Sequence, residues 1–370
     1  MRKGFGLLIL LLTVVLLLSA MNQSFINKLK FEKYFDALDP QVIHENALFK
    51  AVFVHSDKWR YGDLYGLSYL HQYKFKLEPF KSYLRKPGSR KTGKILYIVG
   101  DSFLADKTLS GAFDQFDNVI FFDRRFDFGP VKPDPAKQNY LVMEFAERNL
   151  VDYDIDSTFE VLATNHQVKN GRNSGNTPKK AGTELLQQSV WKRLNNIIFN
   201  PELSRNLELM LFDNTFVSRF KEFKASINYH LFDRVANEVS VSTDKKRLFF
   251  NITVDTARRQ SSFKPQSEQA IDSICHNLQT AKLYYQSIGF KKVFLSVIPN
   301  PVSIYDAEQM PYNHLLERVE KKTDLSVISI YHNFKTEKRN LFYRSDSHWN
   351  PLGLDIWVHE MNRMFTEKLK

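Results

Sequence analysis

Residues 94–106 read KILYIVGDSFLAD, and this stretch predicts the class of fold. The continuous apolar run 95–99 follows a cluster of turn-forming residues and ends at Gly100. A short apolar run between turn residues is typical of a strand buried on both faces, as in a parallel sheet. Functional residues gather at the carboxyl ends of such strands, where Asp101 and Ser102 stand.

Outward from this strand, apolar runs of similar length alternate with helical patterns. The expected strands are 118–122 (NVIFF), 140–145 (YLVMEF) and 293–298 (VFLSVI). Residues 271–288 place apolar side chains on one helical face, and Gly289 is expected to end that helix. The alternation predicts an α/β domain with a mainly parallel sheet.

Composition excludes several classes of protein. The chain has 370 residues, of which 43% are hydrophobic and 25% charged, so it is neither disordered, collagen-like nor a polytopic membrane protein. Its single cysteine, Cys275, excludes an intramolecular disulfide, a cysteine-cluster zinc site and an iron–sulfur cluster held by the chain alone. No histidine spacing indicates a metal site, and no cofactor is expected. The net charge of +11 favours an anionic partner.

The amino-terminal residues 1–22 read as a signal peptide or signal anchor. Arg2 and Lys3 precede an uncharged, leucine-rich run, 5–21, and positive charges before such a run stay on the cytoplasmic side. Leu18 is bulky where cleavage after Ala20 would prefer a small residue, which favours an uncleaved anchor; cleavage would give a secreted protein. In both cases the rest of the chain lies outside the cytoplasm, on the periplasmic or extracellular side, which argues against a nucleic-acid partner.

The rest of the chain divides into two regions. Residues 23–90 are expected to be helical or irregular and to pack onto a main domain, 91–370. An insertion is expected at 165–264: a basic, Asn- and Gly-rich loop at 165–182, then a mixed segment that begins with a helix near 183–199. The loop is either a solvated surface or a contact for an anionic glycan.

Ser102 is the first candidate for chemistry. Gly100 permits a sharp turn, and a helix is expected to begin after Ser102, where backbone N–H groups and the helix dipole favour a developing oxyanion. This is the geometry that a serine nucleophile needs. The alternative is that Ser102 or Asp101 only caps the helix.

A second candidate group lies near the other end of the chain. Residues 343–353 (YRSDSHWNPLG) are rich in turn formers and precede a final amphipathic helix. His348 on this loop could act as base for Ser102, and Asp346 could hold its tautomer. Residues two apart in an extended strand point to opposite sides, so this arrangement requires a bend. The alternative is an Asx-turn at Asp346 and an ordinary helix start at His348.

Together, VGDSF (99–103) and SDSHWNPLG (345–353) resemble the first and last conserved blocks of the SGNH (GDSL-type) hydrolase superfamily. They are most similar to the subgroup of the alginate O-acetylation proteins, whose dyad is written D-x-H-W. Residues 140–150 and 293–313 also look like segments of that subgroup. The resemblance implies an SGNH-like three-layer α/β fold in which Ser102 is the nucleophile, His348 the base and Asp346 its orienting acid.

The chain departs from that pattern in two ways. The superfamily's Gly-x-Asn-Asp block is absent, so the oxyanion donors are open: first the backbone N–H of Ser102, then Arg148 and Asn149, and finally Asn165. The serine precedes the dyad, as in ordinary SGNH enzymes, whereas the dyad comes first in the secreted alginate protein. The dyad is therefore free to dock differently from that relative.

The resemblance implies serine-dependent O-acetyl transfer to a cell-surface or exported polysaccharide. It also implies a multispanning membrane acyltransferase partner that supplies the acetyl group. A carbohydrate acetyl-esterase uses the same residues with water as acceptor, and the sequence does not separate the two activities. A non-catalytic glycan-binding or assembly protein is the third alternative.

Overall fold

The computed structural model describes residues 2–34, 60–86, 91–125, 131–155 and 202–369. The chain divides into two compact units, and each is described by itself. One unit comprises 1–76 and 177–236, and the other, the sheet unit, comprises 77–176 and 237–370.

The sheet unit is built on five parallel strands in the order β2-β1-β3-β6-β7. Their bounds are β1 Lys94–Gly100, β2 Asn118–Asp123, β3 Gln138–Ala146, β6 Phe290–Ile298 and β7 Ser326–Ile328. The predicted α/β class with a mainly parallel sheet is confirmed. Sequence patterning located the first four strands and missed β7, which is only three residues long.

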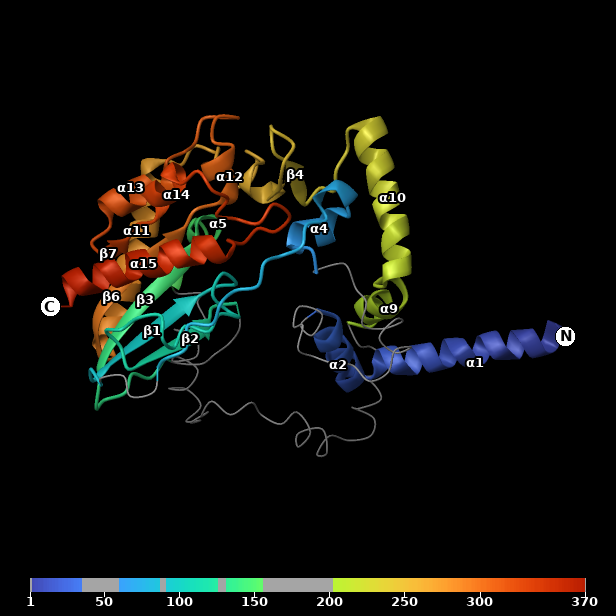
Figure 1. Ribbon diagram of the computed structural model, residues 1–370, viewed down its shortest axis with the longest axis horizontal. Helices are drawn as coiled ribbons and strands as arrows, with labels where there is room; N and C mark the ends of the chain where they lie inside the picture. Colours follow the sequence, from blue (N-terminus) through green and yellow to red (C-terminus); the bar gives the residue numbers. More distant parts are fainter. Residues whose placement is uncertain (1, 35–59, 87–90, 126–130, 156–201, 370) are drawn as a thin grey trace. The chain divides into compact units, whose positions relative to one another are not determined.

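Helices cover both faces of this sheet because successive strand residues point to opposite sides. In β1, Leu96 and Ile98 join one apolar core, whereas Ile95, Tyr97 and Val99 join the other. The first core is completed by α14 (Tyr331–Thr336) and α15 (Pro351–Lys368), and the second by α11 (Glu268–Ser287) and α13 (Leu315–Lys322). Figure 1 shows α15, in red, running along one face.

The remaining short elements of the sheet unit follow its strands. They are α5 (Glu147–Leu150), α12 (Pro301–Tyr305), the 3-10 turn η5 (Asn251–Thr253) and an antiparallel pair, β4 (Val239–Val241) and β5 (Leu248–Phe250). Residues 248–250, which lie within the expected insertion, therefore form a strand of this unit.

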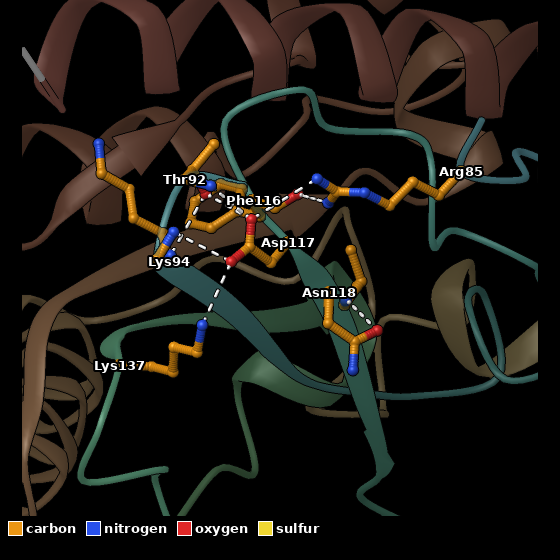
Figure 2. A network of polar contacts seen from close by, with 9 residues as sticks. Arg85, Thr92, Lys94, Phe116, Asp117, Asn118 and Lys137 are labelled. Carbon is orange, nitrogen blue, oxygen red and sulfur yellow. Dashed lines mark hydrogen bonds and ion pairs between the residues drawn. The ribbon is translucent and has the colours of Figure 1, made fainter. Parts of the chain in front are cut away.

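The amino end of the sheet is closed by a polar network around Asp117. Its carboxylate accepts hydrogen bonds from the backbone N–H groups of Thr92, at 2.6 Å, and Gly93, at 3.0 Å. The side chains of Arg85 and Lys137 form ion pairs with it, both at 3.5 Å (Figure 2). The network joins the residues before β1 to those before β2, at the opposite end from the candidate site.

The other unit is helical. It contains α1 (Arg2–Met21), α2 (Gln23–Tyr34), α4 (Asp63–Ser68), η3 (His71–Tyr73), α9 (Leu203–Phe212) and α10 (Thr215–Phe232). Within the described ranges, α1 is the one helix long and apolar enough to cross a membrane, as an anchor or a signal sequence.

These boundaries differ from those expected from composition. Residues 60–76 cluster with α9 and α10 in the helical unit. Residues 237–264, expected in the insertion, belong to the sheet unit. Apolar and charged residues alternate in both stretches, so composition alone does not reveal which partner they pack against.

Candidate active site

Ser102 stands in a turn at the carboxyl end of β1. The expected helix does not form there: residues 102–106 make consecutive turns, and Asp101 Oδ1 accepts a hydrogen bond from the N–H of Phe103 at 3.1 Å. Both Phe103 and Leu104 are buried, so side chains on successive residues must enter the core. These turns, and not a regular helix, carry both side chains into the core. The helix-dipole contribution expected for Ser102 is therefore absent.

The buried side chain of Glu144 contacts the backbone of this turn. Its Oε2 accepts the Asp101 N–H at 2.8 Å, and a Cβ placed on Gly100 would lie 2.4 Å from that same oxygen. Only glycine therefore fits at position 100 without displacing the carboxyl group. Burial, followed by the charge of Asp101, raises the pKa of Glu144 well above its usual value.

The structure brings Ser102, His348 and Asp346 together. His348 Nε2 lies 2.8 Å from Ser102 Oγ, and His348 Nδ1 lies 2.6 Å from Asp346 Oδ1. The chain bends at 344–348, and the backbone pairing of Phe342 with Trp349 closes the loop. Asp346 Oδ1 also accepts the backbone N–H of His348 at 2.9 Å. The Asx-turn and the dyad are thus one arrangement, and the turn supplies the bend that the dyad requires.

Trp349 attaches this loop to the serine turn. Its indole Nε1–H donates to the carbonyl oxygen of Phe103 at 3.2 Å, and the two rings pack edge to face with centroids 5.3 Å apart. The Phe103 ring also lies 4.8 Å from the His348 ring. Phe103 follows Ser102, and Trp349 follows His348. A buried contact between these two neighbours therefore holds the Ser102–His348 contact in place.

His348 and Asp346 are partly enclosed, with 25% and 12% of their side chains exposed. Such partial burial strengthens the contact between an imidazole and a carboxylate and still lets a reactant reach the ring. In chemical terms, the three side chains place an alcohol, an imidazole and a carboxylate in hydrogen-bonded series.

Two of the expected oxyanion donors lie at the same edge of the sheet. Asn149 donates from Nδ2 to Asp101 Oδ2 at 2.9 Å, which places its amide beside the serine turn. Arg148 lies with its guanidinium carbon 5.5 Å from the centre of the Phe103 ring. Among the described residues, the backbone N–H of Ser102 has no acceptor. Asn165 lies outside the described residues.

Sequence reasoning missed the buried acid Glu147. Its carboxylate accepts hydrogen bonds from the N–H of Asn300 at 2.7 Å and from the hydroxyls of Ser303 and Tyr312, both at 3.0 Å. Burial raises its pKa to about 7 despite these three donors. The group joins the carboxyl ends of β3 and β6. An acid immediately after a predicted buried strand was the only local signal for it.

Comparison of the chain with family models, with curated proteins and with solved structures gives no match.

Proposed function

We propose that this protein is a serine-dependent acyl-ester enzyme, with an SGNH-like fold and Ser102 as nucleophile. The observation that carries the proposal is the series Ser102 Oγ–His348 Nε2–Asp346, with contacts of 2.8 Å and 2.6 Å. A serine hydroxyl is a weak nucleophile unless a base takes its proton, and an imidazole needs an acceptor on its other nitrogen to present the correct tautomer. Here His348 Nε2 is placed to take the serine proton, and Asp346 is the acceptor for His348 Nδ1.

The reaction has two halves. In the first, His348 Nε2 takes the Ser102 proton as Oγ bonds to the acyl carbon, and the leaving alkoxide departs with that proton. In the second, an acceptor hydroxyl loses its proton to His348 and attacks the acyl carbon of the acyl-serine; the bond to Oγ breaks, His348 returns the proton to Ser102 Oγ, and a new ester leaves. Asp346 stabilises the imidazolium in both halves, and the Ser102 N–H is the first oxyanion donor.

The proposed reaction is O-acetyl transfer to a cell-surface or exported polysaccharide. The resemblance of the Ser102 and Asp346–His348 segments to the alginate O-acetylation proteins supports the acetyl group and the glycan. The apolar helix α1 supports attachment to a membrane with the enzyme domain outside the cytoplasm, and a multispanning acyltransferase would supply the acetyl group there. Ala20 and Asn206 are fully buried where α1 meets α9, which supports retention of α1 as an anchor.

Arg148 supports an anionic acceptor. Only 8% of the residue is exposed, and in the described part of the chain its guanidinium contacts the rings of Phe103 and Phe250 without an ion pair. A buried guanidinium beside a nucleophile is suited to bind a carboxylate of the incoming sugar.

Hydrolysis is the second candidate function, because the partial exposure of His348 gives water a path to the acyl-serine. The two activities separate when purified full-length chain receives an acetyl donor with and without an oligosaccharide. Transfer predicts acetylated sugar and less free acetate when sugar is present. Release of acetate that is unaffected by sugar supports the esterase.

Ser102→Ala tests the class of chemistry itself. We expect loss of acetyl turnover and of labelling by a fluorophosphonate, with folding unchanged, because Ser102 is only partly buried. Ser110→Ala is the matched control in the same segment, and it should keep both. If Ser102→Ala leaves cellular function intact, the protein is a non-catalytic glycan-binding or assembly protein.

A further inference from the structure

Helix α10 exposes an apolar face. Phe216, Phe220, Phe223 and Leu231 are 70%, 61%, 67% and 72% exposed. At about 100° per residue these positions fall on one side of the helix. Exposed apolar residues scattered singly need no explanation, but a continuous stripe of large side chains marks a surface that another apolar phase covers.

The opposite face of α10, which packs on its own unit, is polar. Ser218 is fully buried, and the buried Glu222 receives hydrogen bonds from Tyr65 and from Lys74 Nζ at 2.9 Å, and contacts His71 Nδ1 at 3.1 Å. The helix therefore turns its polar side inward and its aromatic side outward. This is the reverse of the arrangement in a water-exposed helix of a globular domain.

Cationic side chains lie on both flanks of the stripe. Arg219 and Lys224 are exposed, and each projects between the apolar face and the buried polar face. Aromatic residues with basic residues beside them are the composition of helices that lie in the headgroup region of a membrane. Their charge complements acidic phospholipid headgroups.

The position of α10 relative to the apolar helix α1 connects the stripe to a bilayer. Asn206 of α9 donates from Nδ2 to the carbonyl oxygen of Ala20, at the end of α1, at 2.9 Å. Leu209 packs with Ile26 and Leu29 of α2, just beyond that end. Helix α9 is therefore fixed where the chain would leave the membrane.

Only two residues separate α9 from α10, so α10 begins near that same level. The end of α9 is also apolar and open, with Leu211 and Phe212 41% and 51% exposed. Figure 1 shows α10, in yellow, crossing the direction of α1 rather than continuing it. A helix that crosses a membrane span at its exit lies in the plane of the interface.

We propose that α10 is an interfacial membrane helix: its phenylalanine stripe enters the headgroup and acyl boundary of an acidic bilayer, with Arg219 and Lys224 at the phosphates. The inference goes beyond the proposed function, and it rests on α1 remaining as the anchor. It gives the helical unit a second attachment to the membrane besides α1.

Spin-label accessibility in nanodiscs tests this on the full chain. In a Cys275→Ala background, which removes the single cysteine, Phe220→Cys carries a nitroxide, and the discs contain phosphatidylcholine and phosphatidylglycerol. Leu12→Cys in α1 is the bilayer reference, and Lys338→Cys, on an exposed position of the sheet unit, is the aqueous reference. Collision with oxygen, which concentrates in lipid, is compared with collision with a water-soluble nickel chelate.

We expect the oxygen-to-nickel collision ratio at position 220 to be several-fold higher than at 338 and to approach the ratio at 12. We also expect Arg219→Gln with Lys224→Gln to lower it. Frequent collision with both reagents means that the stripe faces water, and rare collision with both means that protein covers it; either overturns the proposal. A label at position 12 outside the lipid overturns its premise. None of these outcomes depends on acyl-transfer activity.

Discussion

At the residue scale, one oxygen atom of Asp346 decides the geometry of the site. Asp346 Oδ1 accepts both the backbone N–H and the ring Nδ1–H of His348, at 2.9 Å and 2.6 Å. The first bond sets the direction of the chain, and the second sets the direction of the imidazole. Because the same atom does both, the side chain cannot shift without moving the imidazole away from Ser102.

Asp346→Asn should therefore lower acetyl-ester turnover by a factor on the order of 10²–10⁴. An amide no longer favours the tautomer that carries its proton on His348 Nδ1 and leaves Nε2 able to accept the Ser102 proton. The measurement is kcat with a chromogenic acetate ester. Asp272→Asn, an exposed carboxylate that pairs with Lys322, is the control and should keep full turnover. Equal activity of the two variants would contradict the role of Asp346.

The raised pKa of Glu147 predicts how the free energy of unfolding depends on pH. Its folded pKa of about 7 is above the usual 4.5, so the folded chain binds this proton more tightly than the unfolded chain does. The stabilising contribution is complete below about pH 4.5 and is lost as pH rises through about 7. At 1.36 kcal/mol per pKa unit, the loss is about 3 kcal/mol.

Glu147→Gln should remove this dependence. The amide oxygen can accept from Asn300 and Ser303, and the amide nitrogen can face the Tyr312 hydroxyl, so the shape of the cluster is kept. Urea unfolding across this pH range measures the effect. The wild-type free energy of unfolding should fall relative to that of the variant as pH rises, and parallel curves would show that the residue does not titrate there.

At the element scale, the loop 342–349 works as a unit because Trp349 joins it to the serine turn. Trp349→Phe keeps an aromatic ring and removes the Nε1–H bond to Phe103. Trp357→Phe is a matched control, since the buried Trp357 ring packs on Trp349 at 5.8 Å but its indole donates to Ser296 Oγ at 2.9 Å rather than to the serine turn. Each should lose about 1–2 kcal/mol of stability.

Only Trp349→Phe should also lower ester turnover, by about tenfold, because a base displaced by a fraction of an ångström loses its alignment with the nucleophile. Thermal unfolding and kcat measured on both variants separate the two effects. If the turnover of both falls equally, the loss follows from stability and not from the loop.

The network at the opposite end of the sheet should affect folding alone. Asp117→Ala leaves the N–H groups of Thr92 and Gly93 without their acceptor, so we expect a loss of about 1–3 kcal/mol in the free energy of unfolding. Asp123→Ala, at the other end of β2, removes a local surface pair with Arg125 and should lose about 0–1 kcal/mol. Ester turnover of Asp117→Ala, measured well below its unfolding temperature, should match the wild type.

At the scale of the whole molecule, net charge predicts the kind of polymer that the chain attracts. A charge of +11 produces a long-range field that salt screens, with a Debye length of about 10 Å at 0.1 M. The full-length chain should bind a polyuronate, and raising the salt from about 0.05 M to 0.5 M should weaken that binding. Retention on a column of immobilised polyuronate, with neutral dextran as control, measures this. Salt-independent retention would contradict an electrostatic attraction.

What the sequence by itself determined is local. The apolar runs around β1, β3 and β6 predicted buried parallel strands because a continuous run of apolar side chains needs cover on both faces. Ser102 at a strand end and the short spacing of Asp346 and His348 were visible for the same reason: each signal lies within a few residues. The apolar helix α1 was likewise visible from its length and composition.

Only the tertiary structure decided that Ser102 and His348, 246 positions apart, touch. It also replaced the expected helix after Ser102 with turns, buried Glu147 among donors from three other residues, and turned the aromatic face of α10 outward. Each of these depends on which distant segment occupies the neighbouring space, and a pattern along one stretch of chain carries no information about that segment.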